Sequence, residues 1–93
     1  MMQEVLAKPG YEDLPLSEQE FYEICLEETI DGLGGWFVVK QTRASWSEID
    51  RGFMWDKAER EKWLTLEKAQ ECYRVRLQAL RDDGFTQSDM DLF

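Results

Sequence analysis

The sequence contains no histidine, and this absence excludes several classes of site. Without an imidazole there is no histidine general base, no Ser–His or Cys–His pair and no histidine metal ligand. A phosphate-binding glycine loop is also missing, because the glycines at 32, 34 and 35 stand between an expected helix and an expected strand, the reverse of the required order. We therefore expect a protein that is not an enzyme and that has no cofactor and no metal site.

Cysteines and long apolar runs are scarce as well. Cys25 and Cys72 have no CxxC spacing, and both fall on apolar faces of expected helices, so we interpret them as buried free thiols. A Cys25–Cys72 disulfide is the alternative. The longest apolar run, Trp36 to Val39, has strand length, and the N-terminus lacks the basic and apolar regions of a signal peptide. These features predict a cytoplasmic protein.

Charge is present in abundance but is unevenly distributed along a chain of net charge −9. Lys and Arg are absent between Pro9 and Val39, a segment with eight acidic residues: Glu12, Asp13, Glu18, Glu20, Glu23, Glu27, Glu28 and Asp31. Ten of the eleven basic residues follow between Lys40 and Arg81. Globular surfaces usually mix the two signs. The segregation favours a basic protein as partner and disfavours direct binding of nucleic acid or of an anionic membrane.

The acidic segment predicts an amphipathic helix over residues 17–31. Ser17 and Glu20 have the spacing of a capping box, and the glycines that begin at position 32 would end the helix. In that helix four carboxylates would form a row opposite the apolar arc, with about 5–6 Å between neighbours: Glu20, Glu23, Glu27 and Asp31. Such a row would bind a basic protein surface. Its most specific form is a nucleic-acid mimic that blocks a DNA- or RNA-handling protein. The alternative is a solvated face, or one neutralised within the fold by Lys40, Arg43, Arg74 or Arg76.

The remaining pattern predicts a small sheet followed by a second helix. Residues 35–43 have the composition of a strand, 44–47 that of a turn, 49–56 that of an antiparallel partner, and 60–64 that of a shorter strand or a helical turn. A helix capped by Thr65 then runs to Gly84.

The expected fold is therefore α+β: an N-terminal amphipathic helix, a two- to three-stranded antiparallel meander, and a C-terminal helix packed on one sheet face. We divide the chain into an N-terminal arm (1–16), one domain (17–84) and an acidic C-terminal tail (85–93).

The four tryptophans lie within twenty-eight residues: Trp36, Trp46, Trp55 and Trp63. A small sheet cannot easily hide all four, so we expect Trp46 and Trp55 to be exposed anchors for a protein partner. Basic residues interleaved with aromatic residues are also typical of platforms for single-stranded nucleic acid, which gives a second hypothesis.

The chain ends in Asp-Met-Asp-Leu-Phe, with Gln87 two positions before that run. This pattern resembles the linear peptides by which bacterial replication and repair proteins dock on the sliding clamp, although Asp89 stands where the Gln of the short version belongs. It is also similar to the acidic, Phe-terminated tip of bacterial single-stranded-DNA-binding proteins. Either resemblance implies a docking role for Met90, Leu92 and Phe93. The alternative is a frayed end, or Leu92 and Phe93 folded back onto the core.

These observations combine into one leading hypothesis. We expect a small acidic non-catalytic protein–protein interaction module of phage or bacterial origin, a monomer or homodimer that acts as regulator, adaptor or inhibitor. The alternatives are an accessory subunit of a larger assembly and a nucleic-acid-binding module that uses the Trp-rich basic sheet.

Overall fold

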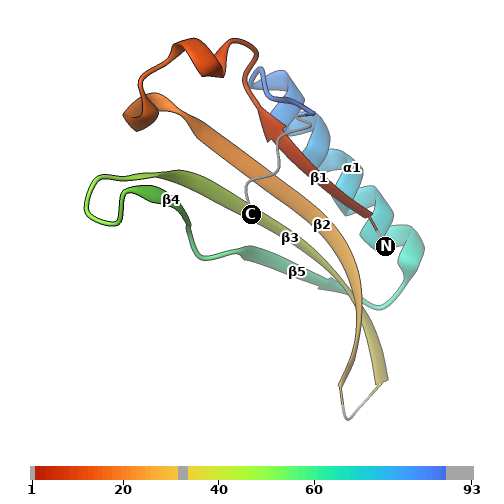
Figure 1. The fold of residues 1–93 in the computed structure, drawn as a ribbon. Helices are drawn as coiled ribbons and strands as arrows, with labels where there is room; N and C mark the ends of the chain where they lie inside the picture. Colours follow the sequence, from red (N-terminus) through yellow and green to blue (C-terminus); the bar gives the residue numbers. More distant parts are fainter. Residues whose placement is uncertain (1, 32–33, 88–93) are drawn as a thin grey trace.

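The computed structural model describes residues 2–31 and 34–87, which form one antiparallel sheet with one α-helix packed across a face (Figure 1). The elements in chain order are β1 (Met2–Ala7), the 3-10 turns η1 (Tyr11–Asp13) and η2 (Leu16–Glu18), β2 (Glu20–Asp31), β3 (Gly34–Ser47), β4 (Gly52–Trp55), β5 (Glu59–Trp63), α1 (Leu66–Asp82) and β6 (Thr86–Gln87). The strand order is β4-β3-β2-β1-β6. β5 also pairs with β3, along the same edge as β4.

The structure corrects the expected fold class. The N-terminal helix over residues 17–31 is wrong, because this segment forms η2 and the long strand β2. The sheet has six strands in the described part of the chain and not two or three, and β1 lies within the segment expected to be an irregular arm. The protein is therefore mainly an antiparallel sheet with a C-terminal helix.

β2 has a helix-like pattern because it is a central strand with buried residues on both faces. Tyr22, Ile24 and Leu26 pack on the side of α1, whereas Phe21 and Cys25 belong to the opposite face. A strand buried on both faces carries apolar residues at consecutive positions, and such a run also fills a broad helical arc. The helical period also places Ile30 in the apolar arc and Ile24 beside the acidic row, whereas Ile24 is buried and Ile30 is 81% exposed.

The expected elements in the second half are largely confirmed. β3 contains the expected strand 35–43 but continues to Ser47, so the turn expected at 44–47 is wrong. β4 and β5 lie where the second and third strands were expected. Both pair with β3 and neither pairs with the other, so they do not form a simple meander.

The boundaries of α1 have the expected local causes. The Thr65 hydroxyl accepts a hydrogen bond from the backbone N–H of Lys68 at 3.4 Å, which caps the first turn. After the helix, Gly84 has φ +95°, a left-handed conformation that favours glycine.

The core lies between α1 and the sheet. Its buried members come from β1, β2, β3, α1 and the turn that follows α1: Leu6, Ile24, Leu26, Val39, Ala69, Tyr73, Leu77, Leu80 and Phe85. We call the sheet face opposite α1 the open face. At one end of it, Phe21 and Ala44 form a second small core with Ala7, and the Tyr11 ring packs edge-to-face on Phe21 at 5.2 Å.

Candidate binding surfaces

The hairpin formed by β2 and β3 projects beyond the rest of the sheet. β1 pairs with β2 as far as Leu26, and β5 pairs with β3 from Phe37 onward. Beyond these positions, among the described residues, residues 27–31 pair only with β3 (34–38), and residues 34–36 pair only with β2 (29–31). We call these two segments the arm. Figure 1 shows the arm extending past the end of α1.

The side chains of the arm are acidic or apolar and are exposed to solvent. Glu27, Glu28 and Thr29 are exposed, and Ile30 is 81% exposed. Ile30 stands opposite Gly35 in the ladder, so no cross-strand side chain covers it. An isoleucine with this exposure is available for contact with another molecule.

The four carboxylates expected in one helical row are divided by the strand. Side chains of a strand alternate between faces, so Glu20 belongs to the side of α1 and Glu23 and Glu27 to the open face. Glu20 accepts a hydrogen bond from Arg43 Nε at 2.8 Å, and Glu23 accepts one from Gln3 Nε2 at 3.1 Å. The side chain of Asp31 lies outside the described part of the structure.

Glu27 is paired as well, with the Lys40 ammonium at 2.6 Å. The hydrogen bond from Lys40 lowers the pKa of the Glu27 carboxyl below its ordinary value. Internal neutralisation by Lys40 and Arg43, the alternative stated for the acidic row, is therefore what the structure shows for Glu27 and Glu20. Glu28 is exposed and has no recorded ion pair within residues 2–31 and 34–87.

A basic hollow lies on the open face between β3 and β5. Lys40 pairs across the ladder with Arg60, and Val38 pairs with Lys62, so the three cations share one face. The hollow encloses about 250 Å³ and is lined by Glu27, Thr29, Val38, Lys40, Arg60 and Lys62. Its ionisable groups sum to three positive charges and one negative charge. This cluster was not among the expected site residues, because its members come together only through the register of β3 and β5.

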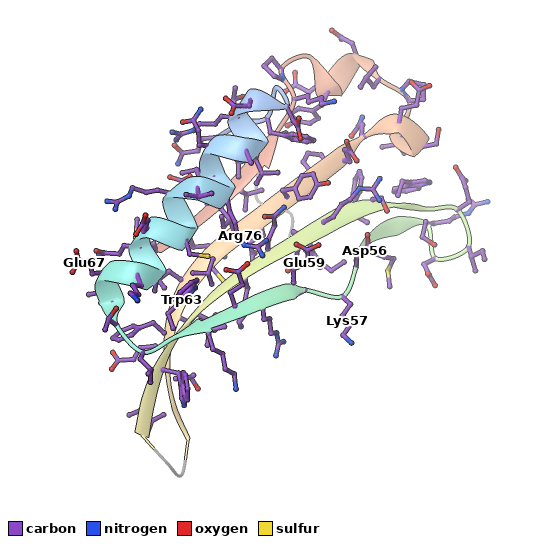
Figure 2. The ribbon with its side chains drawn as sticks, turned by 180° about the vertical axis from the view of Figure 1, so that it is seen from behind. Asp56, Lys57, Glu59, Trp63, Glu67 and Arg76 are labelled. Carbon is purple, nitrogen blue, oxygen red and sulfur yellow. The ribbon has the colours of Figure 1, made fainter. Side chains whose placement is uncertain are left out.

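A second polar cluster lies on the side of α1, where the helix faces β5. Arg76 reaches from α1 to Glu59 at 3.0 Å and to Glu61 at 2.7 Å, as Figure 2 shows for Arg76 and Glu59. The same guanidinium donates to Gln41 Oε1 at 3.1 Å. A cavity of about 400 Å³ borders the cluster and is lined mainly by β5 and α1 side chains, Trp63 and Val75 among them.

Cys72 completes this cluster by donating its thiol hydrogen to Glu61 Oε2 at 2.9 Å. Burial and the hydrogen bond to Glu61 raise the pKa of the Cys72 thiol, so the thiol stays protonated at neutral pH. A protonated thiol is a poor nucleophile and a poor metal ligand. The arrangement therefore joins α1 to β5 and does not activate the cysteine.

Both cysteines are free thiols, as expected. Cys72 lies on α1 and is half-buried, whereas Cys25 is buried on β2 and not on a helix. Among residues 2–31 and 34–87 no three His, Cys, Asp or Glu side chains group in a way that would hold a metal ion. Within the same residues no helix is long and apolar enough to cross a membrane.

The two tryptophans expected to be anchors are half-buried and engaged in internal packing. Trp46 packs edge-to-face on Phe53 at 5.4 Å, and Trp55 packs against the small core of Phe21 and Ala44. Both lie at the end of the open face that is remote from the arm. The residues expected to dock through the tail, Met90, Leu92 and Phe93, lie outside the described residues.

Comparison of the chain with protein-family models, with curated proteins and with solved structures finds no match. The surfaces described above are therefore interpreted from their own chemistry.

Proposed function

We propose that this protein is a small non-catalytic protein-binding module, a regulator, adaptor or inhibitor that contacts a basic surface of another protein. The observation that carries the proposal is the arm, on which Glu28 and Ile30 are exposed past the end of β1. Exposed apolar side chains with adjacent charges are typical of protein contact surfaces. Many internal contacts hold the sheet and α1 together, whereas Glu28 and Ile30 have no comparable internal role.

The corrected fold narrows this proposal. Mimicry of a nucleic-acid strand required four carboxylates in one helical row, and β2 divides the three described ones, Glu20, Glu23 and Glu27, between two faces. We therefore place the contact at the end of the hairpin and no longer along residues 20–31. A cytoplasmic location belongs to the proposal, because free thiols persist in reducing compartments.

Affinity capture at two salt concentrations tests the proposal with a matched pair of variants. Glu28→Lys with Ile30→Ala alters the arm, and Glu71→Lys with Val75→Ala makes the equivalent change on the exposed side of α1. We expect a basic protein that is captured by the wild type and the α1 variant, lost with the arm variant, and weakened at high salt. Equal capture by both variants would refute the assignment to the arm. A salt-resistant partner held in fixed stoichiometry would instead indicate an accessory subunit of a larger assembly.

The basic hollow supports a second candidate function, the binding of single-stranded nucleic acid. Lys40, Arg60 and Lys62 stand on one uncovered face, and Trp36 lies with Lys62 around an adjoining cavity of about 330 Å³. Cations beside an aromatic ring are the usual elements of such a site.

A mobility-shift experiment at low salt tests this second candidate. The double variant Arg60→Glu and Lys62→Glu should lose any shift of a single-stranded oligonucleotide. The control with the same change in charge, Lys57→Glu and Arg74→Glu, should keep it, because those exposed residues lie outside the hollow. Absence of a shift with the wild type at micromolar concentration would dismiss this function and leave the protein-binding proposal unaffected.

A further inference from the structure

The outer edge of the arm is an unpaired β-strand edge. Within the described residues β2 has β1 as its neighbour only over residues 21–26, and the next five residues pair with β3 alone. Every second residue of such an edge directs its backbone N–H and C=O away from the sheet, where another strand can pair with them.

Most proteins protect an edge of this kind with charge or with a bulge. Here the ladder between β2 and β3 continues without a bulge to Asp31↔Gly34. Glu27 is paired with Lys40, so the exposed charge without an ion pair among the described side chains of this edge is the negative Glu28. Pairing with a second copy of the same edge would place carboxylates near carboxylates, which is unfavourable. Charge of one sign therefore excludes self-pairing while it favours a strand of the opposite charge.

We propose that the outer edge of β2 over Glu27–Asp31 receives an extended basic segment of the partner as an additional strand of the sheet. This inference rests on the proposed function and specifies how the partner is bound. Main-chain hydrogen bonds would supply affinity, and the alternating side chains of the arm would supply specificity. The available edge of five residues is about 16 Å long at 3.3 Å per residue.

The faces of the arm define the pattern that the segment should carry. Glu28 and Ile30 share the side of α1, whereas Glu27 and Thr29 share the open face. A matching segment has a basic residue beside Glu28 and an apolar residue two positions away beside Ile30. Its other face lies beside Glu27, which is already paired with Lys40, so no charge is specified there. Ile30, which is 81% exposed, would gain an apolar neighbour that it lacks in the free protein.

Titration with synthetic peptides, followed through the backbone amide signals by NMR, tests this inference. The probe is the capped peptide KKTVKKTV, which carries the pattern described above. Two further forms of it are N-methylated, one at the odd-numbered residues of the peptide and the other at the even-numbered residues. The acidic peptide EETVEETV is the charge control. We expect the probe to shift amides of residues 27–31 and 34–37, and the acidic peptide to leave them unchanged.

N-methylation separates strand addition from simple attraction between charges. At least one methylated form should bind about ten-fold more weakly or worse, because a hydrogen bond worth about 1.4 kcal/mol corresponds to that factor. Equal affinity of all three basic peptides would overturn the inference, as would shifts that map outside the arm. Self-association of the wild-type protein that Glu28→Lys weakens, measured by sedimentation, would also overturn it.

The outcomes for the two proposals are distinct. If capture of the partner depends on Glu28 and Ile30 but all peptides bind alike, the arm binds its partner through side chains only. The proposed function then stands and strand addition is refuted. If the arm variant still captures the partner as the wild type does, the proposed function fails whatever the peptides show.

Discussion

The thiol of Cys72 donates a hydrogen bond to Glu61 Oε2 at 2.9 Å, while the other oxygen of Glu61 accepts from Arg76 at 2.7 Å. One carboxylate on β5 thus receives two donors from α1. The consequences of this arrangement for pKa values and stability can be measured directly.

Alkylation of Cys72 should require unusually high pH. Burial and the Glu61 carboxylate both disfavour the thiolate, so the pKa lies above the ordinary value of 9.0. With Cys25→Ala, which leaves Cys72 as the single cysteine, the rate of reaction with iodoacetamide should have its pH midpoint above 9.0. Glu61→Gln should lower that midpoint, and Glu71→Gln, which removes the neighbouring exposed carboxylate, should not. A midpoint at or below the ordinary value would contradict the hydrogen bond as described.

Arg76→Ala should destabilise the protein. The side chain of Arg76 is only 19% exposed, and its loss removes the charged donors to Glu59 and Glu61. Hydrogen bonds to charged groups contribute about 1.5–3 kcal/mol, and the partial exposure of both carboxylates reduces this, so we expect a loss of about 1–3 kcal/mol. Urea denaturation measures this change in the free energy of unfolding. Arg74→Ala, at an exposed position of the same helix, should change the free energy of unfolding by less than about 0.5 kcal/mol.

Stability should fall with acidification in a way that depends on Glu61. The hydrogen bonds from Cys72 and Arg76 lower the pKa of Glu61 below its ordinary value of 4.5. The contribution of the Glu61 carboxylate to the free energy of unfolding is complete above pH 4.5. It is lost as the pH falls through the lower pKa that Glu61 has in the folded state. Glu61→Gln should therefore reduce the slope of unfolding free energy against pH in the acid range. An unchanged slope would show that Glu61 is not paired in solution.

Tyr73→Phe should be neutral or stabilising. The Tyr73 ring is 1% exposed in the core, and its hydroxyl has no hydrogen-bond partner among the described residues. Burial raises the pKa of Tyr73 to about 12, consistent with a hydroxyl kept from water. A buried hydroxyl without a partner costs about 1–3 kcal/mol, so removing it should raise the free energy of unfolding by as much as about 1 kcal/mol. A decrease of more than about 1 kcal/mol in the free energy of unfolding, measured by urea denaturation, would show that the Tyr73 hydroxyl has a hydrogen-bond partner.

The second half of the fold was predictable because its signals are local. Thr65 and Gly84 bound α1 through capping and a positive φ, and the apolar stripe of that helix has no competing period. The β-branched and aromatic run from Trp36 to Val39 likewise specifies β3 by composition. In each case a few neighbouring residues determine the structure.

β2 was not predictable in the same way, because its environment is set by distant segments. Only the pairing of β1 and β3 on its two sides, with α1 above Ile24 and Leu26, makes consecutive apolar residues consistent with a strand. The basic hollow depends likewise on the register that places Lys40 beside Arg60. Alternation of Arg60 and Lys62 was the one signal for it in the sequence. A strand alternates its side chains between two faces, so Glu20 lies on the side of α1 and Glu23 and Glu27 on the open face. They do not form the single row of carboxylates that the helix predicted.

The pairing of β1 with β6 also determines the order in which the chain can assemble. Leu6 pairs with Gln87 and Ala7 with Thr86, which lies 79 positions further along the chain. The β2–β3 hairpin closes a short loop, so it can form early in synthesis on the ribosome, whereas β6 can pair only after residue 87 has emerged. The pairing of Leu6 and Ala7 with β6 therefore forms later than the hairpin, although β1 is made first.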